Sequence, residues 1–383
     1  MKTKRNLLQL CLLGAVLLPA VVQAQFRFTT NNGAITITGY AGLNAIIPDT
    51  TNGYPVTTIA TTAFTSSPIT NVFIPYTVTN VGNNLFGSSL QLTAINIDAQ
   101  NPLWSSVDGV WFNKDQTTLI QFPAGKSGYT IPNSVANIGN YAFFVCRHLT
   151  NVIIPTSVTS IGSYAFQICT ITNITIPISV TSIGDSAFYQ CYYLASIKIP
   201  ASVTNIGFGV FEDCHGLTSA TLPNNITSLP GSLFYVCSSL TNLTIPSSVT
   251  NIGSFALAST SLQAVYFQGN APSGSTVFYY NLSTPIVYYL PGTTNWGASY
   301  NNRPTMLWNP QAQTGNGSFG VLTNQFGFNI TGTTNIPIVV EACTNLGGAW
   351  LPLQSVSLTN GSSYFSDPQW TNYPGRFYRL RSP

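Results

Sequence analysis

The sequence has very little charge, little histidine and no long apolar segment beyond its first residues. Only 5% of its residues are Asp, Glu, Lys or Arg, against about 25% in an ordinary globular protein. The surface must therefore be built from Thr, Ser, Asn, Gln, Gly and Tyr. A nucleic-acid-binding protein needs a basic face, and an enzyme needs reactive side chains that converge. The composition favours neither, and no later segment is long enough to span a membrane.

The first 24 residues predict a secretory signal peptide. Lys2, Lys4 and Arg5 precede an apolar run at 7–22, and small residues end the segment at Ala24. We expect cleavage after Ala24 and a protein that is secreted or displayed at the cell surface. A retained membrane anchor is the alternative, although the apolar run of about 16 residues is shorter than the roughly 20 that a span needs.

Removing this leader also removes the apparent basicity of the chain. The full sequence has 12 basic and 9 acidic residues, and three of the basic ones lie in the leader. The remaining chain then has 9 residues of each sign, so its net charge is near zero. Electrostatics therefore gives no reason to expect nucleic acid as a partner.

A phrase of about 23 residues repeats through the middle of the chain. It reads Ser-Val-Thr-x-Ile-Gly-x-x-Ala-Phe-x-x-Cys-x-x-Leu-Thr-x-Ile-x-Ile-Pro. A period in this range predicts a solenoid, in which each unit packs only on its neighbours. Copies begin at Val135, Val158, Val180, Val203, Ile226 and Val249, with looser copies at Val56 and Val78.

Each repeat predicts one short helical segment and one short strand. In the unit that begins at Val158, the residues Ala165, Phe166 and Cys169 follow at helical spacing, so we expect one or two helical turns with that face inward. The segment 173–177 alternates as a strand does and ends in a proline, which cannot donate to a ladder.

The cysteines do not follow the pattern of a disulfide-bonded secreted protein. Five of the seven hold one place in successive repeats, where five residues cannot all pair. Unpaired cysteine behaves as a small buried hydrophobe, and single cysteines at this spacing lack the pairs of a zinc site. We expect reduced, buried thiols, with one or two bridges as the alternative. The five are Cys146, Cys169, Cys191, Cys214 and Cys237.

The unit resembles the leucine-rich repeat of the BspA-like surface proteins, in which repeats near 23 residues often read IGxxAFxxCxxLxxIxIP. The residues that carry the match include Ile138-Gly139, Ala142-Phe143, Cys146, Leu149 and Ile154-Pro155. The resemblance implies a leucine-rich-repeat solenoid of short strands and short helical turns. It also implies an exported or surface-exposed protein used for adhesion and binding, with no shared catalytic residues.

The chain beyond the leader divides into five predicted parts. Solenoid ends need caps because their last core layer would otherwise face water, and the alternating residues near the end predict a small antiparallel β-sandwich. The parts are an N-terminal β cap at 25–53, repeats at 54–272 with a hairpin insertion at 101–126, a solenoid cap at 273–309, a linker at 310–318 and the β-sandwich at 319–383.

Candidate catalytic and metal-binding groups are sparse. Two repeats separate His148 from His215, so stacking at about 4.8 Å per layer keeps them from sharing a metal. The segment 212–215 (Glu-Asp-Cys-His) could hold a metal or place a nucleophile beside a base, but we favour a buried cysteine with solvent-facing neighbours. Asp108 and Asp115 fit turns better than a glycosidase pair. We expect no enzymatic activity, cofactor or metal.

Two surfaces are candidates for binding, because tyrosine-rich, charge-poor surfaces suit protein or glycan partners. Alternatively, the tyrosines only cover the edges of the repeats. The strand face is the set of outward strand positions Phe73, Asn96, Ile153, Thr175, Lys198, Thr221, Thr244 and Tyr266. The turn patch is the set of variable positions Phe144, Tyr164, Tyr189, Tyr192, Tyr193, Phe208 and Tyr235.

Two functions remain open from the sequence. The first is a monomeric, secreted or surface-displayed repeat protein that binds extracellular proteins or glycans without catalysis. The alternative is a carbohydrate-active accessory protein or enzyme whose C-terminal β-sandwich stacks sugar on aromatic rings, although such rings also serve as the core of small sandwiches. The rings in question are Trp350, Trp370, Tyr373 and Tyr378.

Overall fold

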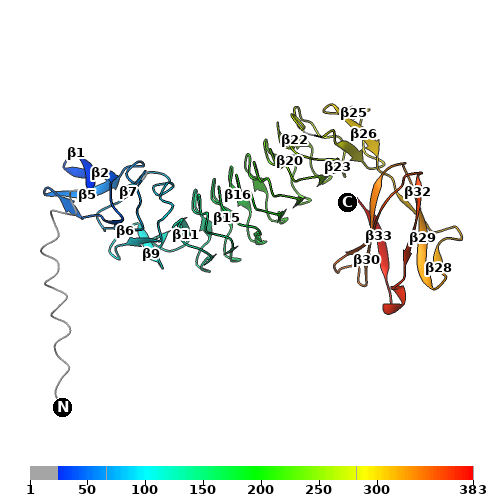
Figure 1. The fold of residues 1–383 in the computed structure, drawn as a ribbon, viewed down its shortest axis with the longest axis horizontal. Coiled ribbons are helices and arrows are strands. Elements are labelled where there is room, and N and C mark those ends of the chain that lie inside the picture. Colours follow the sequence, from blue (N-terminus) through cyan, green and yellow to red (C-terminus); the bar gives the residue numbers. More distant parts are fainter. Residues whose placement is uncertain (1–24, 66, 282, 383) are drawn as a thin grey trace, which may run out of the picture. The chain divides into compact units, whose positions relative to one another are not determined.

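The structure, a computed structural model, describes residues 25–65, 67–281 and 283–382. The predicted leader lies outside the described residues, and Gln25, which follows the predicted cleavage site, is the first residue described. The chain forms two compact units, one ending at Gly216 and the other beginning at Leu217. Short strands dominate both units (Figure 1). No helix in the described part of the chain is long and apolar enough to cross a membrane.

A β-hairpin opens the first unit. β1 (Phe26–Asn31) and β2 (Ala34–Tyr40) are antiparallel and meet at Asn32-Gly33, where both φ angles are positive, as a two-residue hairpin turn requires. β2 then pairs in parallel with β5 (Tyr54–Ile59). The stacking of repeats therefore starts from this hairpin. The same sheet also contains β4 (Thr50–Thr51) and β7 (Asn80–Val81).

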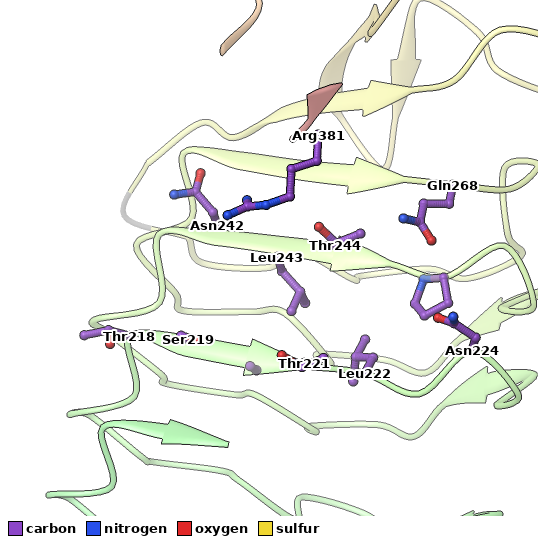
Figure 2. Close-up of a pocket in the computed structure, with 12 residues that line it drawn as sticks. Thr218, Ser219, Thr221, Leu222, Asn224, Asn242, Leu243, Thr244, Gln268 and Arg381 are labelled. Atoms are coloured by element: carbon purple, nitrogen blue, oxygen red, sulfur yellow. The ribbon is translucent and has the colours of Figure 1, made fainter. Parts of the chain in front are cut away.

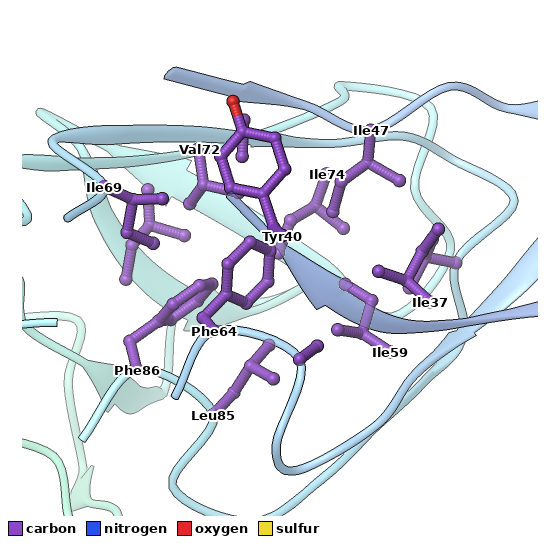
Figure 3. Packing of buried hydrophobic residues seen from close by; sticks show 14 of the residues in the cluster. Ile37, Tyr40, Ile47, Ile59, Phe64, Ile69, Val72, Ile74, Leu85 and Phe86 are labelled. Atoms are coloured by element: carbon purple, nitrogen blue, oxygen red, sulfur yellow. The ribbon is translucent and has the colours of Figure 1, made fainter. Parts of the chain in front are cut away.

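The first repeats surround one hydrophobic cluster. Phe64 and Phe86 are fully buried with ring centroids 5.1 Å apart, and Tyr40 lies 5.9 Å from Phe64. Figure 3 shows these rings among isoleucines of the adjoining strands, including Ile37 and Ile59. Burial of each large apolar side chain stabilises the fold by about 1.5–3 kcal/mol, so the layers hold one another together.

Two sets of parallel strands run through the repeats of the first unit, one from each part of the 23-residue phrase. The first set, with the insertion at its end, consists of β9 (Trp104–Val107), β10 (Val110–Asn113), β11 (Thr118–Gln121), β13 (Asn137–Ile138), β15 (Ser160–Ile161), β16 (Ser182–Ile183) and β18 (Asn205–Ile206). The second set consists of β3 (Asn44–Ile46), β6 (Asn71–Ile74), β8 (Ala94–Ile97), β12 (Tyr129–Thr130), β14 (Val152–Ile153) and β17 (Ser196–Lys198).

The insertion has three strands rather than two. Asp108 and Gly109 have φ angles of 51° and 74° and form a tight turn between β9 and β10. The segment 105–112, which looks like one strand in the sequence, is therefore folded back on itself. A second turn leads into β11, which joins the insertion to the parallel ladder through β13.

The strand predicted at 173–177 does not form. The repeat that begins at Val158 is followed by the next one after 22 residues instead of 23, and the missing residue lies between Cys169 and this segment. A shift of one residue places the backbone out of register with the neighbouring repeats. Thr175 is consequently exposed on an irregular segment rather than on a strand.

The segments predicted as helical are turns, and the structure assigns no α-helix to the residues it describes. The N–H of Phe144 donates to the carbonyl of Tyr141 within its turn, whereas the N–H of Phe143 donates to Ala165 of the next repeat. Tyr141 and Val145 therefore have φ angles of 59° and 56°, which an α-helix excludes. The same pairs of positive φ recur at Tyr164 and Ile168, Ser186 and Gln190, and Gly209 and Asp213.

The phenylalanines of successive repeats form a stacked column inside the first unit. Ring centroids are 4.9 Å apart from Phe143 to Phe166, 5.2 Å from Phe166 to Phe188 and 5.4 Å from Phe188 to Phe211. These distances are slightly larger than the roughly 4.8 Å between neighbouring strands. One ring per repeat therefore fills each layer of the core.

The second unit continues with repeats of the same kind. Residues 273–309, predicted as a solenoid cap, contribute further parallel strands, because β24 pairs with β23 and β26 with β24. The strands are β19 (Ser219–Thr221), β20 (Ser228–Leu229), β21 (Asn242–Ile245), β22 (Asn251–Ile252), β23 (Ala264–Phe267), β24 (Ile286–Tyr289), β25 (Ser299–Tyr300) and β26 (Arg303–Leu307).

Two antiparallel sheets complete the second unit. In one, β29 pairs with β27, β28 and β32; in the other, β30 pairs with β31 and β33. Their inward side chains, Phe328, Ile338 and Phe365 among them, form one cluster. The elements are β27 (Gln311–Gln313), β28 (Gly320–Leu322), β29 (Gln325–Thr331), β30 (Pro337–Cys343), β31 (Leu351–Ser357), β32 (Ser362–Asp367), the 3-10 turn η1 (Trp370–Asn372) and β33 (Phe377–Arg381).

The segment 310–318, predicted as a linker, is partly strand. It contains β27, which pairs with β29. Just before it, the indole of Trp308 donates a hydrogen bond of 3.0 Å to the carbonyl of Pro337. The passage from repeats to antiparallel sheets is therefore ordered and packed.

Candidate functional site

The strand face of the first unit is exposed and almost uncharged. Ile153 is 55% exposed on β14, while Asn96, Thr175 and Lys198 are also exposed and Phe73 is half-buried. Lys198 is the one charged residue among these five. The face therefore offers apolar and hydrogen-bonding groups to a partner rather than a charge pattern.

A hollow of about 480 Å³ lies at the start of this face. We call it the N-terminal hollow. Ile46 is 56% exposed there, beside the half-buried Phe73. The amide of Asn71 donates to the side-chain oxygen of Asn44 at 3.1 Å, which orients both amides along the rim. The lining residues are Asn44, Ala45, Ile46, Asn71, Val72, Phe73 and Asn96.

In the second unit the strand face is partly covered. Thr221 is exposed and Thr244 half-buried, but Tyr266 is only 4% exposed. Its ring stacks on Tyr288 at 4.9 Å and contacts Trp308 edge-on at 6.5 Å, beneath the antiparallel sheets. Tyr266 was predicted to be exposed on the strand face, and that is wrong, because the end of the chain folds over it.

Two adjoining hollows lie where the end of the chain meets the strand face of the second unit, and we call them together the C-terminal groove. The larger, of about 530 Å³, is lined by polar side chains of β19 and β21 (Figure 2). The smaller, of about 240 Å³, is lined by aromatic rings. Both hollows share Gln268 and Arg381. In Figure 2 the Arg381 side chain extends over the strands that carry Asn242 and Thr244.

A buried carboxylate positions Arg381. Glu341 is buried and accepts hydrogen bonds from Arg379 at 2.8 Å and from Arg381 at 2.5 Å. Burial by itself would raise the pKa of Glu341, but the hydrogen bonds and charges of Arg381 and Arg379 outweigh it and lower the pKa. The carboxylate therefore remains ionised and holds both guanidinium groups.

The turn patch is half exposed, and several of its rings pack on residues outside the patch. Tyr193 is 61% exposed and Phe208 and Tyr192 are also exposed, whereas the other members are half-buried. The ring of Tyr164 stacks on Tyr141 at 4.9 Å. This packing agrees with the alternative in which tyrosines cover the edges of the repeats. The half-buried members are Phe144, Tyr164, Tyr189 and Tyr235.

The segment 212–215 forms a surface contact between His215 and Asp213 rather than a nucleophile and base. His215 Nε2 lies 2.6 Å from Asp213 Oδ1, and Gln190 donates to the other Asp213 oxygen at 2.8 Å. Cys214 points inward, and its Sγ donates to the carbonyl of Phe188 at 3.2 Å. Burial, together with Asp213, raises the pKa of Glu212. Among the described residues, no three His, Cys, Asp or Glu side chains form a group that could hold a metal ion.

The five repeat cysteines lie in the core. All are buried, and the Sγ of Cys169 and of Cys191 donate to the carbonyls of Phe143 and Phe166, one repeat earlier, at 3.0 and 3.1 Å. Burial raises the pKa of both thiols. Cys169 and Cys191 are therefore protonated, and all five side chains are buried and unsuited to surface chemistry.

The aromatic rings of the C-terminal sheets do not form an open platform for sugar. The guanidinium of Arg379 lies 4.3 Å from the ring centre of Trp350, and that of Arg376 lies 4.2 Å from Tyr373. Tyr378 stacks on Phe326 inside the cluster, with its hydroxyl donating to Asp367 at 2.8 Å. Trp370 is half-buried, and its indole donates to Asn324. This geometry gives no support to sugar binding on these four rings.

Several lining residues were not predicted from the sequence. Asn44 and Asn71 are register partners on β3 and β6 but lie 27 residues apart, so the 23-residue period alone does not locate them. The period does not locate Arg381 either, because it joins the groove from a strand more than a hundred residues further along the chain. Only the folded chain brings it to β21.

Comparison with known proteins identifies the repeat. Residues 37–125, 126–179 and 159–284 match the BspA type leucine rich repeat region in six copies. The chain is similar to a leucine-rich repeat protein from Bacteroides ovatus (26% identity, TM-score 0.43, 74% of each chain covered). It is also similar to a leucine rich cell surface protein from Faecalibacterium prausnitzii (26%, TM-score 0.33, 63% of this chain and 86% of that one).

A third similar structure is the pneumococcal vaccine antigen PcpA (17% identity, TM-score 0.42, 70% of this chain and 92% of that one). No curated protein matches the chain. The repeat match nevertheless extends over more than half of the 383 residues. The chain belongs to the BspA-type leucine-rich repeat family.

Proposed function

We propose that this is an exported, non-catalytic binding protein that takes an extracellular protein or glycan on the strand face of its first unit. The observation that carries the proposal is the exposure of Ile46 and Ile153, 56% and 55%, on a face with almost no charge. Ile46 lies beside Phe73 in the N-terminal hollow, and exposed apolar area of this kind is typical of interaction sites.

The N-terminal hollow gives this face a place for specific contacts. Apolar area from Ile46 and Phe73 supplies binding energy, while Asn44, Asn71 and Asn96 supply donors and acceptors around it. The paired amides of Asn44 and Asn71 are already oriented, so little side-chain entropy is lost when a partner binds. A role in adhesion follows if the partner is carried by a host or neighbouring cell.

Export is the part of the proposal that rests on residues 1–24. The full chain is expected to appear outside the cytoplasm with Gln25 as its first residue, as sequencing of the secreted or surface-extracted protein would show. A cytoplasmic protein that retains Met1 would contradict the proposal. The chain is expected to be monomeric in light scattering.

Binding is tested with residues 25–383 on parallel protein and glycan arrays. The double substitution Ile46→Ser and Ile153→Ser should lower the affinity for a captured partner by about tenfold or more, as loss of interface anchors does. It should not lower the melting temperature. Ile178→Ser is the matched control, because Ile178 is 81% exposed but lies off the strand face. Equal loss in the control, or no loss in the double variant, would refute the assignment of the face.

A further inference from the structure

The C-terminal groove contains a buried hydroxyl that no protein group satisfies. Tyr266 is only 4% exposed, and its hydroxyl oxygen has no hydrogen-bond partner in the structure. It lines the smaller hollow with Tyr288, Trp308 and Ser382. A buried polar group without a partner destabilises the fold, so the site favours a ligand that supplies one.

The groove also holds an excess positive charge. One carboxylate, Glu341, is shared by Arg379 and Arg381, so the three groups together carry one unit of positive charge. The side chain of Arg381 is 40% exposed and faces the groove. The described residues that line the two hollows include no Asp or Glu. An anionic group on a ligand would therefore meet a fixed guanidinium and no competing carboxylate.

The remaining lining favours a sugar over a peptide. Asn224, Asn242, Gln268 and Thr244 present donors and acceptors that can pair with sugar hydroxyls, and aromatic rings close one end. β23 and β24 already pair on both sides within the ladder. An extended peptide consequently finds no free edge on these two strands.

We propose that the C-terminal groove binds a carboxylate-bearing sugar, with its carboxylate at Arg381 and a ring hydroxyl at Tyr266. This site is separate from the strand face of the first unit and from the four aromatic rings of the C-terminal sheets. Burial and the neighbouring Tyr288 raise the pKa of Tyr266, so its hydroxyl stays a neutral donor. The combined volume of the two hollows admits one or two sugar rings.

The test is calorimetric titration of residues 25–383 with oligogalacturonate, with its uncharged methyl ester and with N-acetylneuraminate. At least one acidic sugar should bind about tenfold or more tightly than the ester, with affinity falling as salt rises. Arg381→Gln should remove the preference for the acid over the ester. The two acids separate a plant-type uronate from an animal-type sialic acid as the source of the carboxylate.

If Arg381→Gln disturbs β33, Tyr266→Phe provides a second test of the site. It removes only the unpartnered hydroxyl, so the melting temperature should stay the same or rise, while affinity falls about fivefold. Tyr300→Phe is the control, since Tyr300 also has a buried hydroxyl but does not line the groove. Equal binding of acid and ester, binding of neither acid, unchanged affinity in Tyr266→Phe, or preferential binding of a peptide with a free C-terminal carboxylate would overturn the proposal.

Discussion

At the scale of single residues, the repeat cysteine combines packing with a hydrogen bond. Its position, spacing and burial could be predicted from the sequence, because an apolar residue of that size recurs once per layer. Its partner could not be predicted, because the accepting carbonyl of Phe143 or Phe166 belongs to the preceding repeat. Serine at the equivalent Ser89 is buried too, but its hydroxyl lacks a partner.

This burial predicts how the thiols react. Most of the six cysteines that follow the leader should be titrated by a thiol reagent in concentrated guanidinium chloride without reductant. The native protein should react very slowly even at mildly alkaline pH, because burial raises the pKa of Cys169 and Cys191 and blocks access. Thiols that appear only after reduction, in numbers that account for two bridges, would contradict the reduced core.

Glu341 predicts a pH dependence for the second unit. The pKa of Glu341 is lowered from 4.5 in the folded state. Its contribution to the free energy of unfolding is therefore fully present above pH 4.5 and is lost as the pH falls through the lower pKa of the folded state. Glu341→Gln should lower the free energy of unfolding by about 1–2 kcal/mol at neutral pH and by progressively less below pH 4.5. This figure is reduced because the two arginines are half exposed to solvent. Urea unfolding followed by tryptophan fluorescence would check this. Asp115→Asn, at an exposed turn, is the control for the change in net charge.

At the scale of elements, the repeat turns have the inward-facing sequence pattern of a helix but not its backbone conformation. Ala, Phe and Cys at helical spacing do face inward, as predicted. Alternate N–H groups nevertheless bond to the next repeat, and this requires positive φ at two residues per turn. A helix would satisfy the same inward pattern with bonds inside the segment alone. The choice depends on a neighbouring repeat at one strand spacing, which no single repeat encodes.

Substitution with glycine tests this turn geometry within one repeat. Ser186 has a φ of 52°, and the equivalent residue of the next repeat is Gly209 with a φ of 59°. Ser186→Gly should therefore raise the free energy of unfolding by about 0.5–1 kcal/mol. Ser182→Gly on β16, where φ is not positive, should lower it by a similar amount. Thermal midpoints of the two variants would decide, and a loss of stability in both would contradict the alternating turn.

At the scale of the whole chain, the last repeats of the second unit and the C-terminal sheets share one hydrophobic cluster. Tyr266, Tyr288 and Trp308 pack with side chains of the antiparallel sheets. The hydroxyl oxygens of Thr244 and Ser382 also lie 3.5 Å apart, across 138 residues of sequence. The C-terminal sheets are consequently a cover for the repeats as well as a region with its own core.

Truncation tests that role. Removal of residues 310–383 should uncover Tyr266, Tyr288 and Trp308, lower the melting temperature and increase binding of a hydrophobic dye, since exposed aromatic patches promote association. Adding Tyr266→Ser and Tyr288→Ser to the truncated chain should restore solubility in part. A truncated chain that stays monomeric, binds no dye and melts as the full chain does would show that the cover is dispensable.

The sequence by itself determined the repeat, its period and which residues of each unit face inward, because these depend on apolar spacing that recurs in every copy. It also indicated the family. Only the tertiary structure decided that the helical spacing forms turns, that the segment 173–177 leaves its ladder, that Tyr266 is covered and that Arg381 reaches the groove. Each of these outcomes depends on contacts between different repeats or between distant parts of the chain. Such contacts form only when backbone groups and side chains must be satisfied together in the folded molecule.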